Sequence, residues 1–473
     1  MRNHRLGRRL AAVVLAAAVA VPLAAVASGG SAFGATISVP CNGGNPAALI
    51  AAIKAANGTA TADTINVAAG CTFVFTAPSD LTDGGNALPV ITTPITINGS
   101  GVTLQRSTAG GTLDFRLVEV SSNGTLTLNG ETLTNGQLTQ GPLSAGAGLL
   151  NFGTTNLKNA KVDGNRVLIS GSPSVPVGGG IANINPGVLN VSNSDVSGNQ
   201  LDASTMCLCM SAAIPLGGGI ANSGTTTIST STVTNNTAQG GGGVVFAFGG
   251  GISSGAANAP MVTITASKLL DNEVTGSDAF GFAVGGGFAG NALSMSSTEV
   301  AGNLTGQLSG YAGEALGGGI AVTKATNISS NSSIHDNQAI GIYGSAAAGG
   351  GVANLAGLTI TSSSIYNNTA GTLSSSAPAF GGGIHNAGTL VLNTTKVSGN
   401  QAFGSPGWGG GIFNAQGATA HLVNSSVKSN QASDDGGGVY NDLSNPSTAV
   451  SGSVTAITGN TPDNCVHVSG CVG

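Results

Sequence analysis

Short runs of alternating apolar and polar residues, separated by turn residues, follow one another along this chain from residue 63 onward. Examples are the segments 63–67, 71–75, 95–97, 117–120 and 126–128, in which apolar residues recur at every second position. A period of two predicts β-strands that bury one face. Glycine-rich turns between the runs exclude long helices beyond the first repeat.

Two motifs alternate through these runs. One is Ser/Thr-x-Val/Ile/Leu-x-x-Asn, whose first residue is alanine in the first copy only. Its asparagines recur 30 to 37 residues apart, at Asn165, Asn199, Asn236, Asn272, Asn303, Asn337, Asn368, Asn400, Asn430 and Asn460. The other motif is a glycine triplet followed by an apolar residue, and its copies start at Gly178, Gly217, Gly249, Gly285, Gly317, Gly349, Gly381, Gly409 and Gly436.

A period of this length is the signature of stacked repeats. Identical positions in neighbouring coils lie one strand spacing apart, about 4.8 Å, so each side chain must tolerate its own copy above and below. Val, Ile and Leu do so in a core, asparagine does so as an amide ladder, and glycine permits positive φ where the coil bends. The segment 381–400 contains three short strands, so we predict an all-β parallel β-helix with one such segment per coil.

One helix is expected, over Asn45–Ala56, with Asn45 as N-cap and Pro46 in the first position. A short amphipathic helix before a solenoid is typical of a cap. We therefore divide the chain into a signal peptide at 1–35, an N-terminal cap at 36–75, the β-helix at 76–462 and a C-terminal cap at 463–473.

The signal peptide is indicated by basic residues from Arg2 to Arg9 and an apolar run over 10–27. An uncleaved anchor is the alternative. No later stretch has the roughly 18 apolar residues that a membrane span needs. Cleavage would leave 10 of the 14 basic residues against 19 acidic residues, a net charge of −9, so we expect no nucleic-acid partner. The protein is expected to be secreted or associated with the cell surface.

Six cysteines in an exported chain predict disulfides. Cys41 with Cys71 and Cys465 with Cys471 are expected to staple the two ends of the solenoid. Cys207 and Cys209 are too close in sequence for an easy bridge. A strained bridge between them, a cross-loop bond and a soft-metal site are the alternatives, of which we favour a bridge.

The alternation of glycine triplet-Ile/Val with Val/Ile-x-x-Asn resembles the repeats of polymorphic outer-membrane proteins, and the arrangement resembles the right-handed parallel β-helix of the pectate-lyase-like superfamily. The segment Cys41–Phe75 is similar to the N-terminal cap of secreted proteins of that kind. The resemblance covers about 41–465. The resemblance implies a right-handed β-helix. If this chain is one of the enzymes of the superfamily, the resemblance implies polysaccharide lyase or hydrolase activity.

Catalytic candidates are few. Asp434 and Asp435, with His385, form the best set for acid–base chemistry, although aspartates before glycine are also ordinary turn residues. The second and fourth positions of the asparagine motif face outward and form two columns, which run from Lys161 to Ala456 and from Asp163 to Thr458. Neither column has acidic residues in two neighbouring repeats. Nor do they form the regular threonine array that an ice-binding rod would need. The histidines are dispersed without nearby cysteines, so we predict no metal site and no cofactor.

One repeated position changes in residue type towards the C-terminus of the chain. The residue after each glycine triplet-apolar unit is small in most repeats but becomes His385, Phe413 and Tyr440 in three successive ones. Trp408, the single tryptophan, precedes a glycine triplet among them. Aromatic faces beside carboxylates suit sugar rings, so these four residues are our ligand-binding candidates. Alternatively, the segments inserted between each asparagine and the next glycine triplet cover the rings, which then form a satellite core.

We therefore expect a β-solenoid that binds polysaccharide or another surface without catalysis, as an adhesion or binding protein. The alternative is a polysaccharide lyase or glycoside hydrolase of the pectate-lyase-like superfamily.

Overall fold

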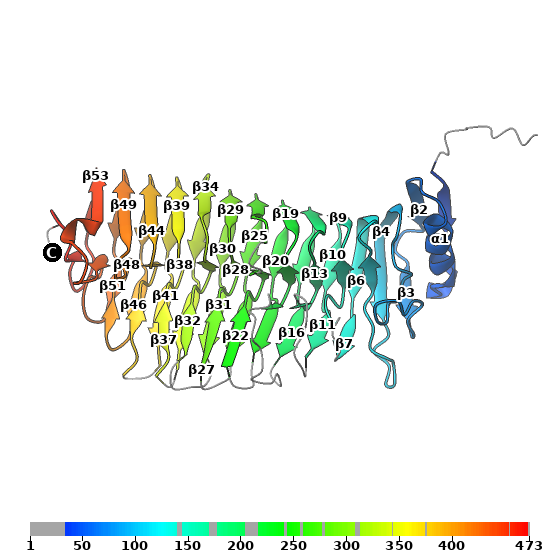
Figure 1. Ribbon diagram of the computed structural model, residues 1–473, viewed down its shortest axis with the longest axis horizontal. Helices are drawn as coiled ribbons and strands as arrows, with labels where there is room; N and C mark the ends of the chain where they lie inside the picture. The colour runs from blue at the N-terminus through cyan, green and yellow to red at the C-terminus, as the bar shows by residue number, and fades with distance from the viewer. Residues whose placement is uncertain are drawn as a thin grey trace, which may run out of the picture. The chain divides into compact units, whose positions relative to one another are not determined.

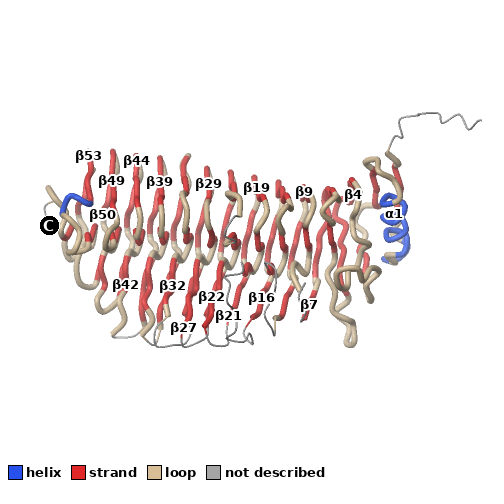
Figure 2. The backbone as a smooth tube through the Cα atoms, in the orientation of Figure 1, coloured by secondary structure: helices blue, strands red, loops and turns tan. Residues whose placement is uncertain are grey.

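The sequence folds into a stack of parallel β-coils (Figure 1), in which the described residues form strands along its length and helical turns only near its ends (Figure 2). This computed structural model describes residues 34–139, 144–169, 177–203, 216–240, 244–255, 259–276, 280–307, 313–342, 344–373, 376–453 and 455–471. These residues belong to one compact unit with about 12 coils. The expected all-β right-handed parallel β-helix is confirmed.

Three walls enclose the interior of each coil. Wall 1 contains β1 (Thr36–Val39), β2 (Asp63–Val67), the first halves of β4 (Pro94–Arg106) and β6 (Thr125–Thr134), then β9 (Thr154–Lys158), β14 (Val188–Ser192), β19 (Thr225–Ser229), β24 (Val262–Thr265), β29 (Leu293–Ser296), β34 (Thr326–Ser329), β39 (Gly357–Thr361), β44 (Thr389–Asn393), β49 (Thr419–Val423) and β53 (Val450–Ser453).

Wall 2 follows after a corner and carries the asparagine motif. Its strands are β3 (Thr72–Phe75), the second halves of β4 and β6, β10 (Lys161–Asp163), β15 (Asp195–Ser197), β20 (Thr232–Thr234), β25 (Lys268–Leu270), β30 (Glu299–Ala301), β35 (Ser333–His335), β40 (Ser364–Tyr366), β45 (Lys396–Ser398), β50 (Ser426–Lys428) and β54 (Ala456–Thr458).

Wall 3 follows the glycine triplets. Its strands are β5 (Val118–Val120), β8 (Leu149–Asn151), β13 (Ile181–Asn183), β18 (Ile220–Asn222), β23 (Ile252–Ser254), β28 (Phe288–Gly290), β33 (Ile320–Val322), β38 (Val352–Asn354), β43 (Ile384–Asn386), β48 (Ile412–Asn414), β52 (Val439–Asn441) and β55 (Cys465–Val466).

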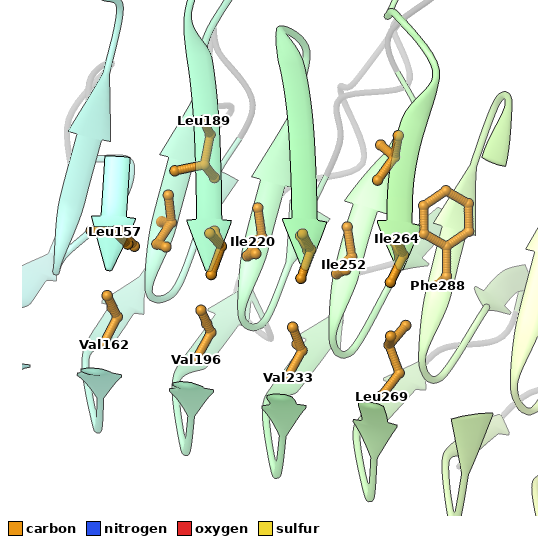
Figure 3. Close-up of a cluster of buried hydrophobic side chains, with 14 of the residues drawn as sticks. Leu157, Val162, Leu189, Val196, Ile220, Val233, Ile252, Ile264, Leu269 and Phe288 are labelled. Carbon is orange, nitrogen blue, oxygen red and sulfur yellow. The ribbon is translucent and has the colours of Figure 1, made fainter. Parts of the chain in front are cut away.

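The main core lies between the three walls. Leu189, Val196 and Ile220 point into it from walls 1, 2 and 3 (Figure 3). All three are fully buried. In register with aliphatic residues of both neighbouring coils, Val196 lies between Val162 and Val233 and Ile220 lies between Ile181 and Ile252. The period-two pattern therefore places its apolar residues where the sequence predicts them.

The asparagine ladder predicted at the end of wall 2 is present. From Asn199 onward, each side-chain oxygen accepts hydrogen bonds from the backbone N–H and the amide nitrogen of the asparagine one coil earlier. That of Asn337 accepts both from Asn303, at 3.0 and 2.9 Å. The amide nitrogen of Asn337 donates in turn to Asn368 and to the carbonyl of Val300. Because these asparagines are buried, the ladder satisfies backbone groups that water cannot reach.

Two separate constraints, on backbone conformation and on space, require glycine in the triplets. Gly381, the first of its triplet, has φ of 64°, which L-residues other than glycine rarely adopt. A Cβ on Gly383, the third, would lie 2.7 Å from the carbonyl oxygen of Gly411 and 3.0 Å from the carboxamide of Asn400. The turn therefore fits tightly between the next coil and the asparagine ladder.

The segments between each asparagine and the next glycine triplet form a lateral layer of two sheets over wall 3. Its first sheet contains β7 (Gln137–Thr139), β11 (Arg166–Leu168), β16 (Gln200–Ala203), β21 (Thr237–Gly240), β26 (Glu273–Gly276), β31 (Leu304–Gln307), β36 (Gln338–Gly341), β41 (Thr369–Thr372), β46 (Gln401–Phe403) and β51 (Gln431–Ala432). Its second contains β22 (Val244–Phe248), β27 (Phe280–Val284), β32 (Glu314–Leu316), β37 (Ala346–Ala348), β42 (Ala379–Phe380) and β47 (Gly407–Trp408), and a separate pair is β12 (Val177–Gly178) with β17 (Leu216–Gly217).

Small side chains let the two lateral sheets approach closely. Ala315, Ala347 and Ala379 of the second sheet pack with Ala339 and Ala370 of the first in one buried cluster. Wall 3 is consequently buried on both faces, because its outward residues, such as Ala321 and Ala353, pack against the lateral layer. The inserted segments are therefore an additional layer of structure.

The expected capping helix is α1 (Ala47–Asn57), one residue displaced from its predicted start. The side-chain oxygen of Asn45 accepts a hydrogen bond from the N–H of Ala47, and Leu49 and Ile53 are fully buried against the first coils. Short 3₁₀ turns are η1 (Asn42–Gly44) and η2 (Ser447–Ala449). No helix in the described part of the chain is long and apolar enough to cross a membrane.

Two predicted disulfides are confirmed, Cys41–Cys71 near the first coil and Cys465–Cys471 near the last. Cys207 and Cys209 lie outside the described residues, as does the expected signal peptide apart from its last two residues. The bridge favoured for the central pair stays a prediction.

Candidate binding surfaces

The structure brings the predicted aromatic residues together. His385 of β43, Phe413 of β48 and Tyr440 of β52 are in register on wall 3, with ring centroids 5.5 Å apart at both steps. Trp408 of β47 stacks on Tyr440 at 5.0 Å, and Phe380 of β42 contacts Phe413 at 4.8 Å. These five residues are called the aromatic cluster below.

Burial decides how accessible the aromatic cluster is. Phe413 and Tyr440 keep only 5% exposure each, while Phe380 and Trp408, which belong to the lateral layer, are half-buried above them. This is the packing expected of a satellite core covered by the inserted segments. Ligand binding by His385, Trp408, Phe413 and Tyr440 stays a prediction.

The candidate catalytic groups do not converge. Burial lowers the pKa of His385 to about 4, so its ring is neutral at pH 7, and its Nδ1 has no hydrogen-bond partner among the described residues. A carboxylate oxygen of Asp434 accepts a hydrogen bond from the N–H of Gly407 at 2.8 Å, which fixes a lateral turn. Asp435 pairs with Trp408 through a single β-bridge. Within the described residues, no interaction joins His385 to either aspartate.

The outer face of wall 1 carries a second candidate surface. Its outward side chains form two columns, in which most residues are Thr, Ser or Asn. The first column is Thr64, Thr96, Thr127, Asn156, Asn190, Thr227, Thr263, Ser294, Asn327, Thr359, Val391, His421 and Ser451. The second is Asn66, Asn98, Asn129, Lys158, Ser192, Ser229, Thr265, Ser296, Ser329, Thr361, Asn393, Val423 and Ser453. We call the two columns the polar array.

Amide ladders fix the first part of the polar array. Asn98 donates to Asn66 at 3.0 Å, and Asn129 donates to Asn98 at 3.2 Å. In the other column Asn190 donates to Asn156 at 2.9 Å. These bonds hold the amides in one orientation before any ligand arrives, which lowers the entropy lost on binding.

Hydroxyl groups dominate the later part of the polar array. Thr227, Thr263 and Ser294 follow one another in the first column, and Thr265 and Ser296 are neighbours in the second. All five are partly exposed. None of their hydroxyls has a side-chain hydrogen bond to another described residue, so each is available to a ligand.

Charged residues cluster instead on wall 2. Lys268 pairs with Glu299 at 2.7 Å, and the ring nitrogens of His335 lie 3.3 Å from Glu299 and 2.7 Å from Asp336. Tyr366 stacks on His335 at 4.5 Å. The polar array contains a single Lys, Arg, Asp or Glu, which is Lys158, so walls 1 and 2 differ sharply in charge.

Sequence reasoning missed the polar array because the outward positions it tested belong to wall 2. The usable signal was the pair of polar residues that flank an apolar position in the preceding strand, as Thr227 and Ser229 flank Ile228. Those positions have no fixed residue type and therefore form no motif.

No group of three or more His, Cys, Asp or Glu suited to a metal ion exists in the described part of the chain. Comparison with family models, with curated proteins and with solved structures gives no match to this chain.

Proposed function

We propose that this chain is an exported, non-catalytic binding protein of the pectate-lyase-like type, which holds an extended neutral polysaccharide along the polar array. The observation that carries the proposal is the extended, nearly uncharged set of hydroxyl and amide groups in register on wall 1. Hydroxyl-rich sugars form hydrogen bonds with such groups, and a neutral surface gives no advantage to a charged ligand.

Binding along an array depends on adding weak contacts. A single hydrogen bond contributes only about 0.5–1.5 kcal/mol in water. Because neighbouring groups are one strand spacing apart, about 4.8 Å, a polymer chain contacts several of them at once. The mixture of Thr, Ser and Asn, interrupted by Val391 and His421, suits an adaptable polymer better than a rigid crystal lattice, which requires the same group at every step.

Export and an extracellular location are part of the proposal. The two disulfides support it, because such bonds persist in oxidising compartments. The basic and apolar N-terminal segment supports it as well.

The test is binding of neutral and acidic polysaccharides by affinity electrophoresis, followed by reducing-end and unsaturated-product assays on each ligand found. Thr227→Arg with Thr263→Arg places bulky charges on two neighbouring strands of the array. We expect at least about a tenfold loss of affinity, equivalent to 1.4 kcal/mol. Ser333→Arg with Ser364→Arg is the matched control, since these half-buried neighbours occupy the same kind of outward position on wall 2.

Equal loss in both variants, or absence of binding to every neutral polysaccharide, contradicts the proposal. Product formation that disappears in Asp435→Ala would instead establish the lyase or hydrolase alternative.

A further inference from the structure

A cavity of about 540 Å³ opens at the C-terminal end of the described solenoid. Leu422 and Val450 line it with core side chains, Ile457 and Thr455 belong to the last coil, and Val468 and Ser469 line it from the loop that follows β55. Cavities of this size hold small organic groups or several side chains. None of the described residues that line it is charged.

The cavity exists because one core side chain is missing. Gly452 of β53 is in register with Leu422 of β49, at an inward position that is occupied in earlier coils by Val191, Ile228, Ile264, Met295, Ile328, Ile360 and Leu392. Ile457 is also only half-buried, whereas its counterparts Val397 and Val427 are fully buried. The apolar layer at the last coil is therefore incomplete, since Ile457 and Val468 pack against the core while only partly buried.

The loop that closes the end leaves two strand edges free. It is held on the wall 3 side, where Cys465 and Cys471 are bridged and the carbonyl of His467 accepts a hydrogen bond from the amide of Asn441. Within the described residues β53 pairs only with β49, and β54 pairs only with β50, while the strands of walls 1 and 2 from β6 to β50 pair on both sides.

Free strand edges beside an uncharged cavity that aliphatic side chains line in part are the two components of recognition by strand addition. The edge supplies backbone hydrogen bonds and the cavity receives alternate side chains of an added strand. Since the lining is neutral, a charged side chain would enter it without a partner, at a cost of several kcal/mol. The occupant that satisfies both components is an extended peptide with small polar and aliphatic residues in alternation.

We infer that the C-terminal end of the solenoid binds such a peptide segment as an additional strand parallel to β53, with an aliphatic side chain above Gly452. This inference is independent of polysaccharide binding by wall 1. It assigns a peptide-docking site to the end of the stack.

The probe is a fluorescent peptide with the sequence of residues 388–400, which carries one wall 1 strand and one wall 2 strand of an internal coil. Leu392 in this peptide is the counterpart of the side chain missing at Gly452. We expect saturable one-to-one binding by fluorescence anisotropy. A control peptide with Leu390→Ser, Leu392→Ser and Val397→Ser should bind at least about tenfold more weakly, since each lost aliphatic group removes roughly 1 kcal/mol or more.

Two variants locate the site on the protein. Ser469→Trp fills the cavity from the exposed loop and should abolish binding of the parent peptide. Leu443→Trp, at an exposed position outside both the cavity lining and the polar array, is the matched control and should bind normally. Gly452→Leu fills the cavity from the strand, although its Cβ would meet the carbonyl oxygen of Leu422 at 2.8 Å, so its thermal unfolding is measured alongside.

Peptide affinity unchanged in Ser469→Trp, or equal affinity for the parent and serine peptides, overturns the inference. Binding of a neutral alkyl glycoside in the same cavity, with no binding of the peptide, also overturns it and assigns the cavity to a small apolar ligand.

Discussion

The buried asparagines show how a single residue type holds the coils together. Asn337 accepts two hydrogen bonds from Asn303 and donates to Val300 and Asn368. Its removal leaves buried donors and acceptors unpaired, and each such group costs about 1–3 kcal/mol. The ladder is thus a continuous element of stability.

We predict that Asn337→Ala lowers the free energy of unfolding by about 2–4 kcal/mol, because several buried groups lose their partner together. Urea denaturation followed by circular dichroism measures it. The control is Asn327→Ala, an exposed asparagine on wall 1, which should change stability by less than about 0.5 kcal/mol. Similar values for the two variants would show that the ladder contributes little.

Glu131 is a second residue whose environment has a measurable consequence. Burial raises the pKa of its carboxyl group to about 8, and no hydrogen bond of normal geometry reaches either oxygen among the described residues. The folded state therefore retains this proton to higher pH than the unfolded state, where an ordinary glutamate titrates near 4.3.

We predict that the raised pKa of Glu131 makes the protein lose stability as pH rises from about 4.5 to 8, because the folded state binds more protons than the unfolded state in that interval. Glu131→Gln should remove this part of the pH dependence and be more stable than the parent above pH 8. Urea midpoints across the interval measure the effect, with Glu273→Gln as control. A parent-like pH profile in Glu131→Gln would contradict the assignment.

At the scale of elements, wall 3 and the lateral layer form a second core. Phe413 is 5% exposed, between His385 and Tyr440 in its own column and under Phe380. Side chains packed on all sides stabilise the fold through their removal from water. Neighbouring rings thus cover Phe413 in this structure, while ligand binding by the aromatic cluster stays a prediction.

We predict that Phe413→Ala destabilises the protein by about 3–5 kcal/mol, as large-to-small changes of buried aromatic residues do. Phe403→Ala, on lateral strand β46 with 37% exposure, should cost much less. Thermal unfolding of both variants compares them. Normal stability of Phe413→Ala together with loss of glycan binding would favour the aromatic cluster as the ligand site.

The stacked positions could be predicted from the sequence, and the lateral strands could not. Residues such as Asn400 and Gly381 recur because each lies directly on its own copy, so the physical constraint reappears at every repeat. The lateral strands follow segments of different length, and the cluster that joins their two sheets consists of alanine, as at Ala347 and Ala379. Alanine has no strong preference for strands, and without a fixed spacing the pairing register leaves no pattern.

The polar array could not be predicted from the sequence for a related reason. Thr227, Thr263 and Ser294 are outward residues with only weak constraints on their identity, so no motif marks them. Only their register in neighbouring strands joins them into a surface. The aromatic candidates were found because they interrupt a column of small residues, although the sequence could not decide between ligand and satellite core.

At the scale of the whole molecule, the two ends of the described stack differ in how completely they are covered. Helix α1 covers the first coils with Leu49 and Ile53, both fully buried, whereas β53 and β54 leave a cavity at the other end. Exposed strand edges pair readily with other chains, so a cap protects against association.

We predict that Ile53→Asp weakens the cap, because a charge would enter an apolar interface, and that the protein then associates through the uncovered coils. Light scattering and sedimentation during mild heating detect this association. Lys54→Asp, an exposed neighbour on the same helix, should remain like the parent. Equal association of the two variants would attribute the effect to charge alone.

The polar array is an extended surface, and its length provides the most direct test of polysaccharide binding. The measurement is isothermal titration of the protein with neutral oligosaccharides of increasing length from one polysaccharide that binds. We predict that affinity rises steadily with length until the oligosaccharide spans the array, because each added sugar reaches further groups on successive strands. Affinity that stops rising after two or three sugars would place binding in a local pocket and contradict the array as the binding surface.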